Sequence, residues 1–320
     1  MRLINLFYAL LLCLCIISLV SCHPLPKYTY NYIGLEKFKG DTLYLRRVTG
    51  DRLKLDRDYG KAPLDSKVIR NGMVTFSGAI DTLHLYYIEG KNCSTFFYPE
   101  LGEVTHTYLK TTKYSNPQSI AKKYKALREK GFPKNESRNF MFSNLQNAMG
   151  VYLLDHIGYY PNELDKIYKK SNLAMRDTVS LFLSLKKQLS ETKELNRGNM
   201  YIDFDQRGFE HDSIHFFNYF NRDKVVCLFF FNGDSSSFFE KIIEINNTYN
   251  NVYFVGYSNK YITDFNFVNV LKRDYKVHLF DDRGKYEKSV MYKYRVDYRI
   301  ATNYYLIFSS DGRLIDKYIN

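Results

Sequence analysis

The spacing of apolar residues divides the chain into segments with different periodicities. Between about residues 30 and 109, short runs rich in β-branched and aromatic residues alternate with polar ones, and they are separated by Gly40, Asn71-Gly72, Gly78 and Gly90. This alternation is typical of short antiparallel strands that each have one buried face. We therefore expect a small antiparallel β-sandwich over residues 30–112, with a hairpin turn at Asn71-Gly72.

The period becomes helical in the middle of the chain, over residues 113–197. Ile120, Tyr124 and Leu127 are spaced to share one face of a helix, and a second set with helical spacing runs from Phe142 to His156. Apolar stripes of this kind usually pack into a core, so they indicate no ligand site. We expect residues 113–197 to form a helical linker domain.

Strand and helix signals alternate over residues 198–320. The apolar run Val225–Phe231 is followed by a tight turn and a helix, and a hairpin near residues 304–318 closes the chain. This order predicts a mixed sheet covered by helices. The predicted fold class of the whole chain is therefore α+β and multidomain, with an antiparallel β-sandwich, a helical middle segment and a C-terminal α/β domain.

The N-terminus has the pattern of an export signal. An apolar run follows Arg2, and its end, Leu19-Val20-Ser21-Cys22, resembles a bacterial lipobox. The resemblance implies a lipid on Cys22, loss of residues 1–21 as a signal peptide, and a tether over residues 22–29. It also implies a mature chain outside the cytoplasm, anchored to the inner or outer membrane of a bacterial envelope. An ordinary signal peptide or an uncleaved anchor of about 18 residues is the alternative.

Cysteine usage excludes a disulfide framework. Cys13 and Cys15 would leave with the signal and Cys22 would carry lipid, so an exported chain retains only Cys93 and Cys227 as thiols. Cys227 lies in an apolar run that reads as a buried strand, where a free cysteine usually acts as a small hydrophobic residue. We do not expect a bridge between these two cysteines.

The charge is strongly basic but dispersed. The formal net charge is +12, and it falls to +11 when Arg2 leaves with the signal. Lysines and arginines are spread along the chain, which indicates a solvated surface that can lie against anionic headgroups and disfavours a nucleic-acid site.

Residues 200–320 resemble a thioredoxin-like module of the TlpA and ResA type. The resemblance rests on the order and spacing of four segments: Asp203–Gly208, Lys224–Val226, Val252–Ser258 and Leu306–Ile315. Two earlier segments, Leu64–Gly78 and Phe96–Val104, resemble the N-terminal domain of unknown function that precedes such modules in Gram-negative envelope lipoproteins. Val74 and Pro99-Glu100-Leu101 depart from the pattern of that domain, to which the resemblance assigns no catalysis.

The resemblance also places the redox site, and this chain lacks its chemical groups. Ser235-Ser236-Ser237-Phe238 stands where the family has Cys-x-x-Cys, so Ser235 replaces the nucleophile and Phe238 the resolving cysteine. Thr302 stands at the position of the family's cis-proline. A serine nucleophile would need a general base, so we prefer a structural role in which Ser237 caps the helix and Glu240 completes a capping box.

No cofactor or metal is expected. His211 and His215 could share a face, but an ordinary strand is the better interpretation, and no phosphate loop or zinc signature occurs. The sequence favours a membrane-anchored lipoprotein whose redox-inactive thioredoxin-like domain binds an unknown protein or peptide or serves a structural role. A divergent thiol-disulfide oxidoreductase or peroxiredoxin-like enzyme using Cys227 or Cys93 is the alternative. An accessory subunit that pairs with an active thioredoxin-like neighbour is a third hypothesis.

Overall fold

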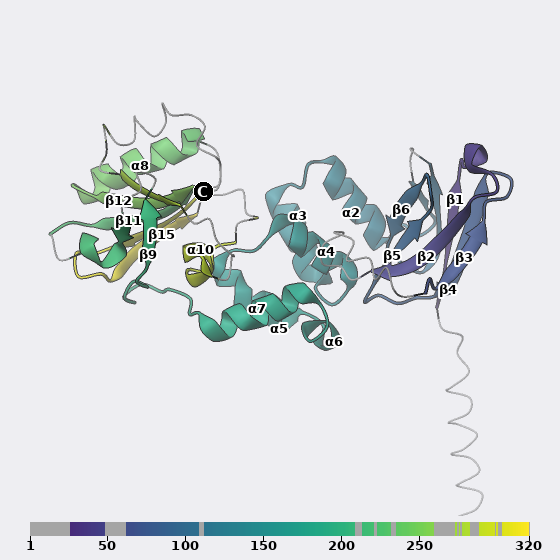
Figure 1. Cartoon of the computed structure of the whole chain (residues 1–320), viewed down its shortest axis with the longest axis horizontal. Helices are drawn as coiled ribbons and strands as arrows, with labels where there is room; N and C mark the ends of the chain where they lie inside the picture. The colour runs from purple at the N-terminus through teal and green to yellow at the C-terminus, as the bar shows by residue number, and fades with distance from the viewer. Residues whose placement is uncertain are drawn as a thin grey trace, which may run out of the picture. The chain divides into compact units, whose positions relative to one another are not determined.

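The computed structural model (Figure 1) describes residues 26–48, 62–108, 112–208, 213–220, 223–231, 235–258, 273, 275, 277–281, 288–297, 299 and 303–319. Cys22 and the predicted signal peptide lie outside these residues, and so does Thr302. Two compact units are present: one extends to Phe140 and includes Asn147–Met149, and the other comprises Met141–Gln146 and the chain from Gly150 onward. The boundary lies within the helical segment, so the helices expected as a separate linker domain are divided between the units.

The first unit contains two four-stranded sheets. One has the order β4 (Met73–Ala79), β1 (Lys27–Ile33), β7 (Gly102–Thr107), β8 (Thr112–Tyr114), and the other has the order β3 (Asp65–Val68), β2 (Thr42–Val48), β5 (Leu85–Glu89), β6 (Ser94–Phe97). The strand pairs are antiparallel except β1 and β7, which run parallel. The chain passes through the other sheet between β1 and β7, which gives the long connection that a parallel pair requires. The sandwich is therefore mixed where a purely antiparallel one was expected.

The core of the sandwich is built from alternate residues of its strands. Tyr28, Tyr30 and Tyr32 of β1 are buried, whereas the intervening Thr29 and Asn31 are partly exposed. They pack with Leu43 and Leu45 of β2 and with other apolar residues of both sheets, namely Val74, Phe76, Tyr86, Ile88, Phe97 and Val104. Alternation of this kind confirms the sandwich, since one face of each sheet is covered by the other.

The turn at Asn71-Gly72 forms, but its two arms enter different sheets. Asn71 has φ 49° and Gly72 has φ 70°, the two positive values that a type I′ turn requires. Arg70 pairs with Met73 across the turn. The hairpin ends there, because β3 belongs to the sheet of β2 and β4 to the sheet of β1.

A buried carboxylate fixes the first helix of this unit. Helix α2 (Ile120–Glu129) begins after Ser119, whose hydroxyl accepts from the Lys122 backbone N–H and donates to the Glu100 carboxylate. The Ile120 backbone N–H donates to the other Glu100 oxygen at 2.8 Å. A negative group at a helix N-terminus satisfies free N–H groups and is favoured by the helix dipole. Glu100 thus ties α2 to the loop between β6 and β7. Helix α3 (Lys134–Asn144) follows.

The second unit contains a seven-stranded sheet. Its order is β10 (Ser213–His215), β9 (Asp205–Gly208), β13 (Val277–Asp281), β12 (Tyr253–Ser258), β11 (Val226–Phe231), β14 (Tyr304–Phe308), β15 (Leu314–Ile319). Strands β11, β12 and β13 are parallel, and β14 and β15 form the expected antiparallel hairpin at one edge. Helix α8 (Ser235–Tyr249) connects β11 to its parallel neighbour β12, which gives the crossover connection that a parallel pair needs.

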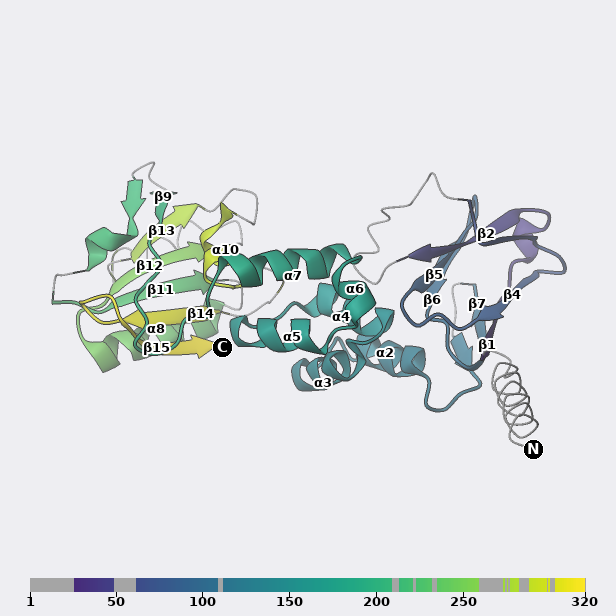
Figure 2. The ribbon, with the colours of Figure 1, turned by 90° about the horizontal axis from the view of Figure 1, so that it is seen from below.

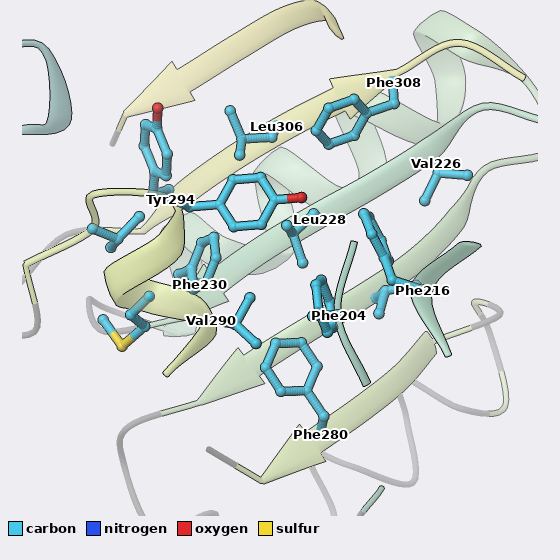
Figure 3. Close-up of a cluster of buried hydrophobic side chains, with 14 of the residues drawn as sticks. Phe204, Phe216, Val226, Leu228, Phe230, Phe280, Val290, Tyr294, Leu306 and Phe308 are labelled. Carbon is cyan, nitrogen blue, oxygen red and sulfur yellow. The ribbon is translucent and has the colours of Figure 1, made fainter. Parts of the chain in front are cut away.

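Both faces of this sheet are covered. Alternate residues of β11 face opposite sides: Cys227, Phe229 and Phe231 pack under α8, which lies along one face in Figure 1. Figure 3 shows the other face, where Leu228 and Phe230 meet Val290 and Tyr294 from the segment around α10 (Val290–Lys293). The continuous apolar run of β11 is explained, because a strand buried on both faces needs no polar positions.

Figure 2 shows four further helices from below: α4 (Ala148–Ile157), α5 (Leu164–Lys170), α6 (Leu173–Arg176) and α7 (Ser180–Glu191). The described residues also include the short 3-10 helices η1 (Glu36–Phe38), η2 (Pro161–Glu163) and η3 (Phe216–Tyr219). Buried polar contacts join α4 and α7 to the segment just before β14. Arg299 donates to Asp155 at 2.8 Å and to Asp297 at 2.7 Å, and Asp297 also accepts from the Tyr159 backbone N–H. The Gln188 side chain donates to the Tyr292 carbonyl at 3.0 Å. Helices α4 and α7 are therefore tied to the α/β sheet of the second unit.

Candidate functional site

The start of α8 is the position that the sequence resemblance assigns to chemistry. The helix begins immediately beyond the carboxyl end of β11, with its N-terminus at the edge where parallel strands end, which is the usual place for sites in α/β folds. A cysteine there would have its pKa lowered by the helix dipole and by free backbone N–H groups. In this chain the corresponding positions are Ser235 and Phe238.

Phe238 is part of the hydrophobic core. Its side chain is fully buried, and its ring centroid lies 5.0 Å from that of Phe229, 4.9 Å from that of Phe231 and 6.0 Å from that of Tyr305. Edge and offset contacts of this kind add to the stabilisation from burial. The position to which the sequence resemblance assigns a resolving thiol is therefore occupied by a ring that packs from α8 against β11 and β14.

Helix α8 begins before the predicted cap residue, Ser237. Because α8 begins at Ser235, Ser237 lies inside the first turn and does not occupy the cap position, and Glu240 lies further along the helix with its side chain exposed. Three successive serines tolerate the cap and the first turn almost equally well, so the sequence alone does not fix the starting residue. Ser237 Oγ instead accepts from Asn303 Nδ2 at 3.4 Å.

Asn303 is a residue that the sequence analysis did not single out. It directly follows Thr302, it is 1% exposed, and it brings an amide from the start of β14 to the first turn of α8. Tyr305, two residues later, is fully buried, and burial raises the pKa of its phenol far above the ordinary value. The signal available in the sequence was an Asn directly after the expected cis-proline position and before an apolar strand, where a polar side chain needs a partner.

Neither described cysteine has the environment of a reactive thiol. Cys227 lies in the middle of β11 with no exposed surface, and burial raises its pKa well above the ordinary value. Cys93 is 7% exposed in the first unit, and its pKa is raised by burial and, to a smaller extent, by the Asp41 carboxylate. Both are free thiols. Reactive cysteines have lowered pKa values and accessible sulfur atoms, which is the reverse of this pattern.

The histidine pair considered as a metal site is not assembled in the described structure. His215 Nδ1 lies 2.7 Å from Asp205 Oδ1, an ordinary side-chain pair, and His211 lies outside the described residues. Within the described ranges no three His, Cys, Asp or Glu side chains gather in a metal-binding arrangement. No helix among those same residues combines the length and apolarity needed to cross a bilayer.

The strand order β12-β11-β14-β15, with α8 as the crossover and a final antiparallel hairpin, defines a thioredoxin-like domain. No protein-family model and no curated protein matches the chain.

Solved structures that do match include three thioredoxin-like proteins. The C-terminal domain of a putative thiol-disulfide oxidoreductase from Bacteroides thetaiotaomicron is 20% identical over 38% of this chain and 86% of its own, with a TM-score of 0.29. A putative thiol:disulfide interchange protein DsbE from Chlorobium tepidum is 14% identical over 39% and 86%, with a TM-score of 0.29. A thioredoxin-like protein from Bacteroides caccae is 11% identical over 64% and 85%, with a TM-score of 0.34. At such identities the likeness concerns the fold alone, and the assignment to the thioredoxin-like class rests on the strand order.

Proposed function

We propose that this chain is an exported, lipid-anchored envelope protein whose thioredoxin-like domain has no dithiol redox activity and serves as a binding or structural module. The observation that carries the proposal is the burial of Phe238 at the position of the resolving cysteine. Resolution of a mixed disulfide needs a second thiolate close to the first. A phenyl ring that is part of the core excludes such a group at this position.

The thiol chemistry of the rest of the chain supports the same proposal. An enzyme using Cys93 or Cys227 would need a thiolate at neutral pH, yet burial raises the pKa of both thiols. Both side chains are also buried, so a disulfide substrate could not approach either sulfur in the folded state. These observations favour a non-redox role over the alternative of a divergent thiol-disulfide oxidoreductase or peroxidase.

Insulin reduction provides a test of the redox proposal. A purified chain beginning at His23 should reduce insulin with dithiothreitol no faster than dithiothreitol alone, and the Cys93→Ala and Cys227→Ala variants should not differ from it. A thioredoxin with an intact dithiol serves as the positive control. Turnover above the background that disappears in either cysteine variant would contradict the proposal.

Lipid anchoring rests on Cys22 and the apolar run before it. In cells labelled with a fatty acid, the chain should carry label, and Cys22→Ala should lose it. Cys15→Ala is a matched control, since that residue lies inside the apolar run and should leave the label unchanged. Label retained by Cys22→Ala would contradict the anchoring proposal. A single acyl chain binds a membrane only marginally, so firm attachment needs the several chains that lipoproteins receive.

The proposed partners follow from this arrangement. Lipid on Cys22 would hold the mature chain at a membrane surface, and the dispersed positive charge would suit anionic headgroups. The thioredoxin-like domain would bind an unidentified protein or peptide, and no nucleic-acid partner is proposed. Purification of the lipidated chain with its membrane neighbours after chemical crosslinking, with the Cys22→Ala variant as the control, would identify such a partner.

A further inference from the structure

The first unit contains a cavity that the thioredoxin-like domain plays no part in forming. It has a volume of about 180 Å³ and lies between α2 and strands of the sandwich. An apolar cavity of about 150 Å³ is large enough to hold a benzene molecule. The space therefore suits one aromatic ring with a small substituent. Its lining comprises Tyr30, Thr95, Phe96, Phe97, Tyr98, Val104, His106, Tyr114, Ala121, Tyr124, Lys125, Arg128 and Met149.

The interior of the cavity is aromatic. Tyr30 and Phe97 stack with ring centroids 4.0 Å apart and planes inclined by 15°, and Tyr124 of α2 is buried on the helix side. Ala121, one helical turn before Lys125, carries only a methyl group towards this space. Small-molecule sites are typically concave and mostly apolar, with a few polar groups that fix orientation.

One of those polar groups is the hydroxyl of Tyr30. Its oxygen is buried without a hydrogen-bond partner, and Thr95 lies close to it without meeting the geometry of a hydrogen bond. Burial raises the pKa of this phenol far above its ordinary value, so the hydroxyl keeps its proton. Buried polar groups are nearly always paired in native proteins, and leaving one unpaired is costly. A ligand hydroxyl or carbonyl in the cavity would supply the missing partner.

The rim of the cavity is cationic. Lys125 and Arg128 are three residues apart on α2 and therefore lie on one face of the helix. No carboxylate of the described chain lies within salt-bridge distance of Arg128, and Lys125 pairs only with the exposed Glu129, at 3.7 Å. On the strand side, burial and then Lys125 lower the pKa of His106, which is therefore neutral at pH 7. Two cations at the opening favour a ligand with a negative group.

Helix α2 is held in place independently of any ligand. Ser119 and the Ile120 backbone N–H both bind the buried Glu100 carboxylate, which anchors the helix to the loop that joins β6 and β7. The helix that carries the two cations is thus anchored to the sandwich that supplies the aromatic wall before a ligand arrives. Preorganisation of this kind reduces the entropy that binding has to overcome.

We propose that this cavity binds a small phenolic carboxylate. The ring enters the aromatic interior, the phenol hydrogen-bonds to the Tyr30 hydroxyl, and the carboxylate remains at the rim with Lys125 and Arg128. The lining residues all belong to the first unit, namely the sandwich, α2 and Met149 at the start of α4, so the site does not depend on whether the thioredoxin-like domain is redox-active.

The probe is 4-hydroxyphenylacetate, titrated calorimetrically into the full chain beginning at His23. Two related compounds each test one end of the ligand. Phenylacetate lacks the phenol hydroxyl, and tyramine has an ammonium group in place of the carboxylate. We expect saturable binding of 4-hydroxyphenylacetate, about tenfold weaker binding of phenylacetate because one buried hydrogen bond is lost, and no measurable binding of tyramine. Equal binding of tyramine, or no binding of 4-hydroxyphenylacetate at millimolar concentration, would overturn the proposal.

Variants of α2 locate the site. The double variant Lys125→Gln/Arg128→Gln should weaken binding by about tenfold or more, since charge-assisted hydrogen bonds are lost. The matched control Lys122→Gln/Lys123→Gln removes the same charge from exposed positions on the same helix and should bind like the original chain.

Blocking the cavity gives a second test of location. Ala121→Leu should abolish binding by filling the space, while far-UV circular dichroism and the unfolding temperature report that the variant remains folded. Undiminished binding by folded Ala121→Leu, or an equal loss in the two double-glutamine variants, would overturn the proposal.

Tyr30→Phe should bind phenylacetate and 4-hydroxyphenylacetate equally. Should that variant not fold, the two ligands compared on the unaltered chain give the same information.

Discussion

The start of α8 and the cavity beside α2 differ in whether their side chains are used in packing. At the start of α8, Phe238 occupies the position that the sequence resemblance assigns to the resolving cysteine, and its ring is packed against rings from β11 and β14. Beside α2 an unpaired Tyr30 hydroxyl and two cations surround empty space. In the first region the side chain stabilises the core. In the second, an unpaired buried hydroxyl costs stability, and a ligand would offset that cost.

The largest effect is expected at Phe238. Phe238→Ala should lower the free energy of unfolding by about 4 kcal/mol, because a fully buried ring is removed and a cavity remains. Urea denaturation followed by circular dichroism measures the change. Ile243→Ala on the same helix is the control, since its side chain is 44% exposed and its truncation should cost little. A small effect at Phe238 would mean that the helix start is open, as an active site would be.

The next largest effect is expected at Asp297, which joins the helices to the α/β sheet. Its carboxylate is 1% exposed and bonds to Arg299 and to the Tyr159 backbone N–H. Asp297→Asn should cost about 3 kcal/mol, because it removes a buried carboxylate that pairs with the Arg299 guanidinium. Asp311→Asn is the control: its pair with Arg313 is exposed on both sides, and we expect a loss below about 1 kcal/mol. Equal losses would show that the helices are not tied to the sheet through this network.

The smallest effect is a pH dependence that arises in the cavity wall. Burial and Lys125 lower the pKa of His106 in the folded chain, so below a pH of about 6.5 the unfolded chain binds more protons than the folded one. The contribution of the neutral His106 to the free energy of unfolding is complete above that pH. It is lost as the pH falls towards the lowered pKa of the folded chain. Urea denaturation at pH 7.5 and at pH 5.5 should therefore show a smaller loss of stability in His106→Leu than in the original chain. Identical losses would contradict the burial of this imidazole.

The sequence predicted those features that depend on local patterning. The apolar run of β11 and the closing hairpin follow from residue periods and turn residues, and the structure confirms them. Periodicity cannot determine which elements share a core. The parallel pairing of β1 with β7 and the division of the helices between two units depend on long-range contacts that leave no local pattern.

Some residues of the candidate sites could be predicted from the sequence and others could not, again because local patterns do not show long-range contacts. Ser235 and Phe238 were identified because the resemblance supplied a motif with fixed spacing, whereas Ser237 was placed in the cap because serine suits either position. Asn303 and the cavity were missed. Tyr30, His106 and Arg128 come from three separate elements, and only folding brings them together.

The reactivity of the two thiols is the most direct test of the proposal that this thioredoxin-like domain has no redox chemistry. A chain beginning at His23 contains Cys93 and Cys227 as its only cysteines, and it would be mixed with 5,5′-dithiobis(2-nitrobenzoate) at pH 7.5 with and without urea. We expect both thiols to react rapidly in urea. In the native chain we expect them to react only as slowly as the protein opens, because both are buried and have raised pKa values. Rapid reaction of either thiol in the native chain, assigned through the Cys93→Ala and Cys227→Ala variants, would contradict the proposal.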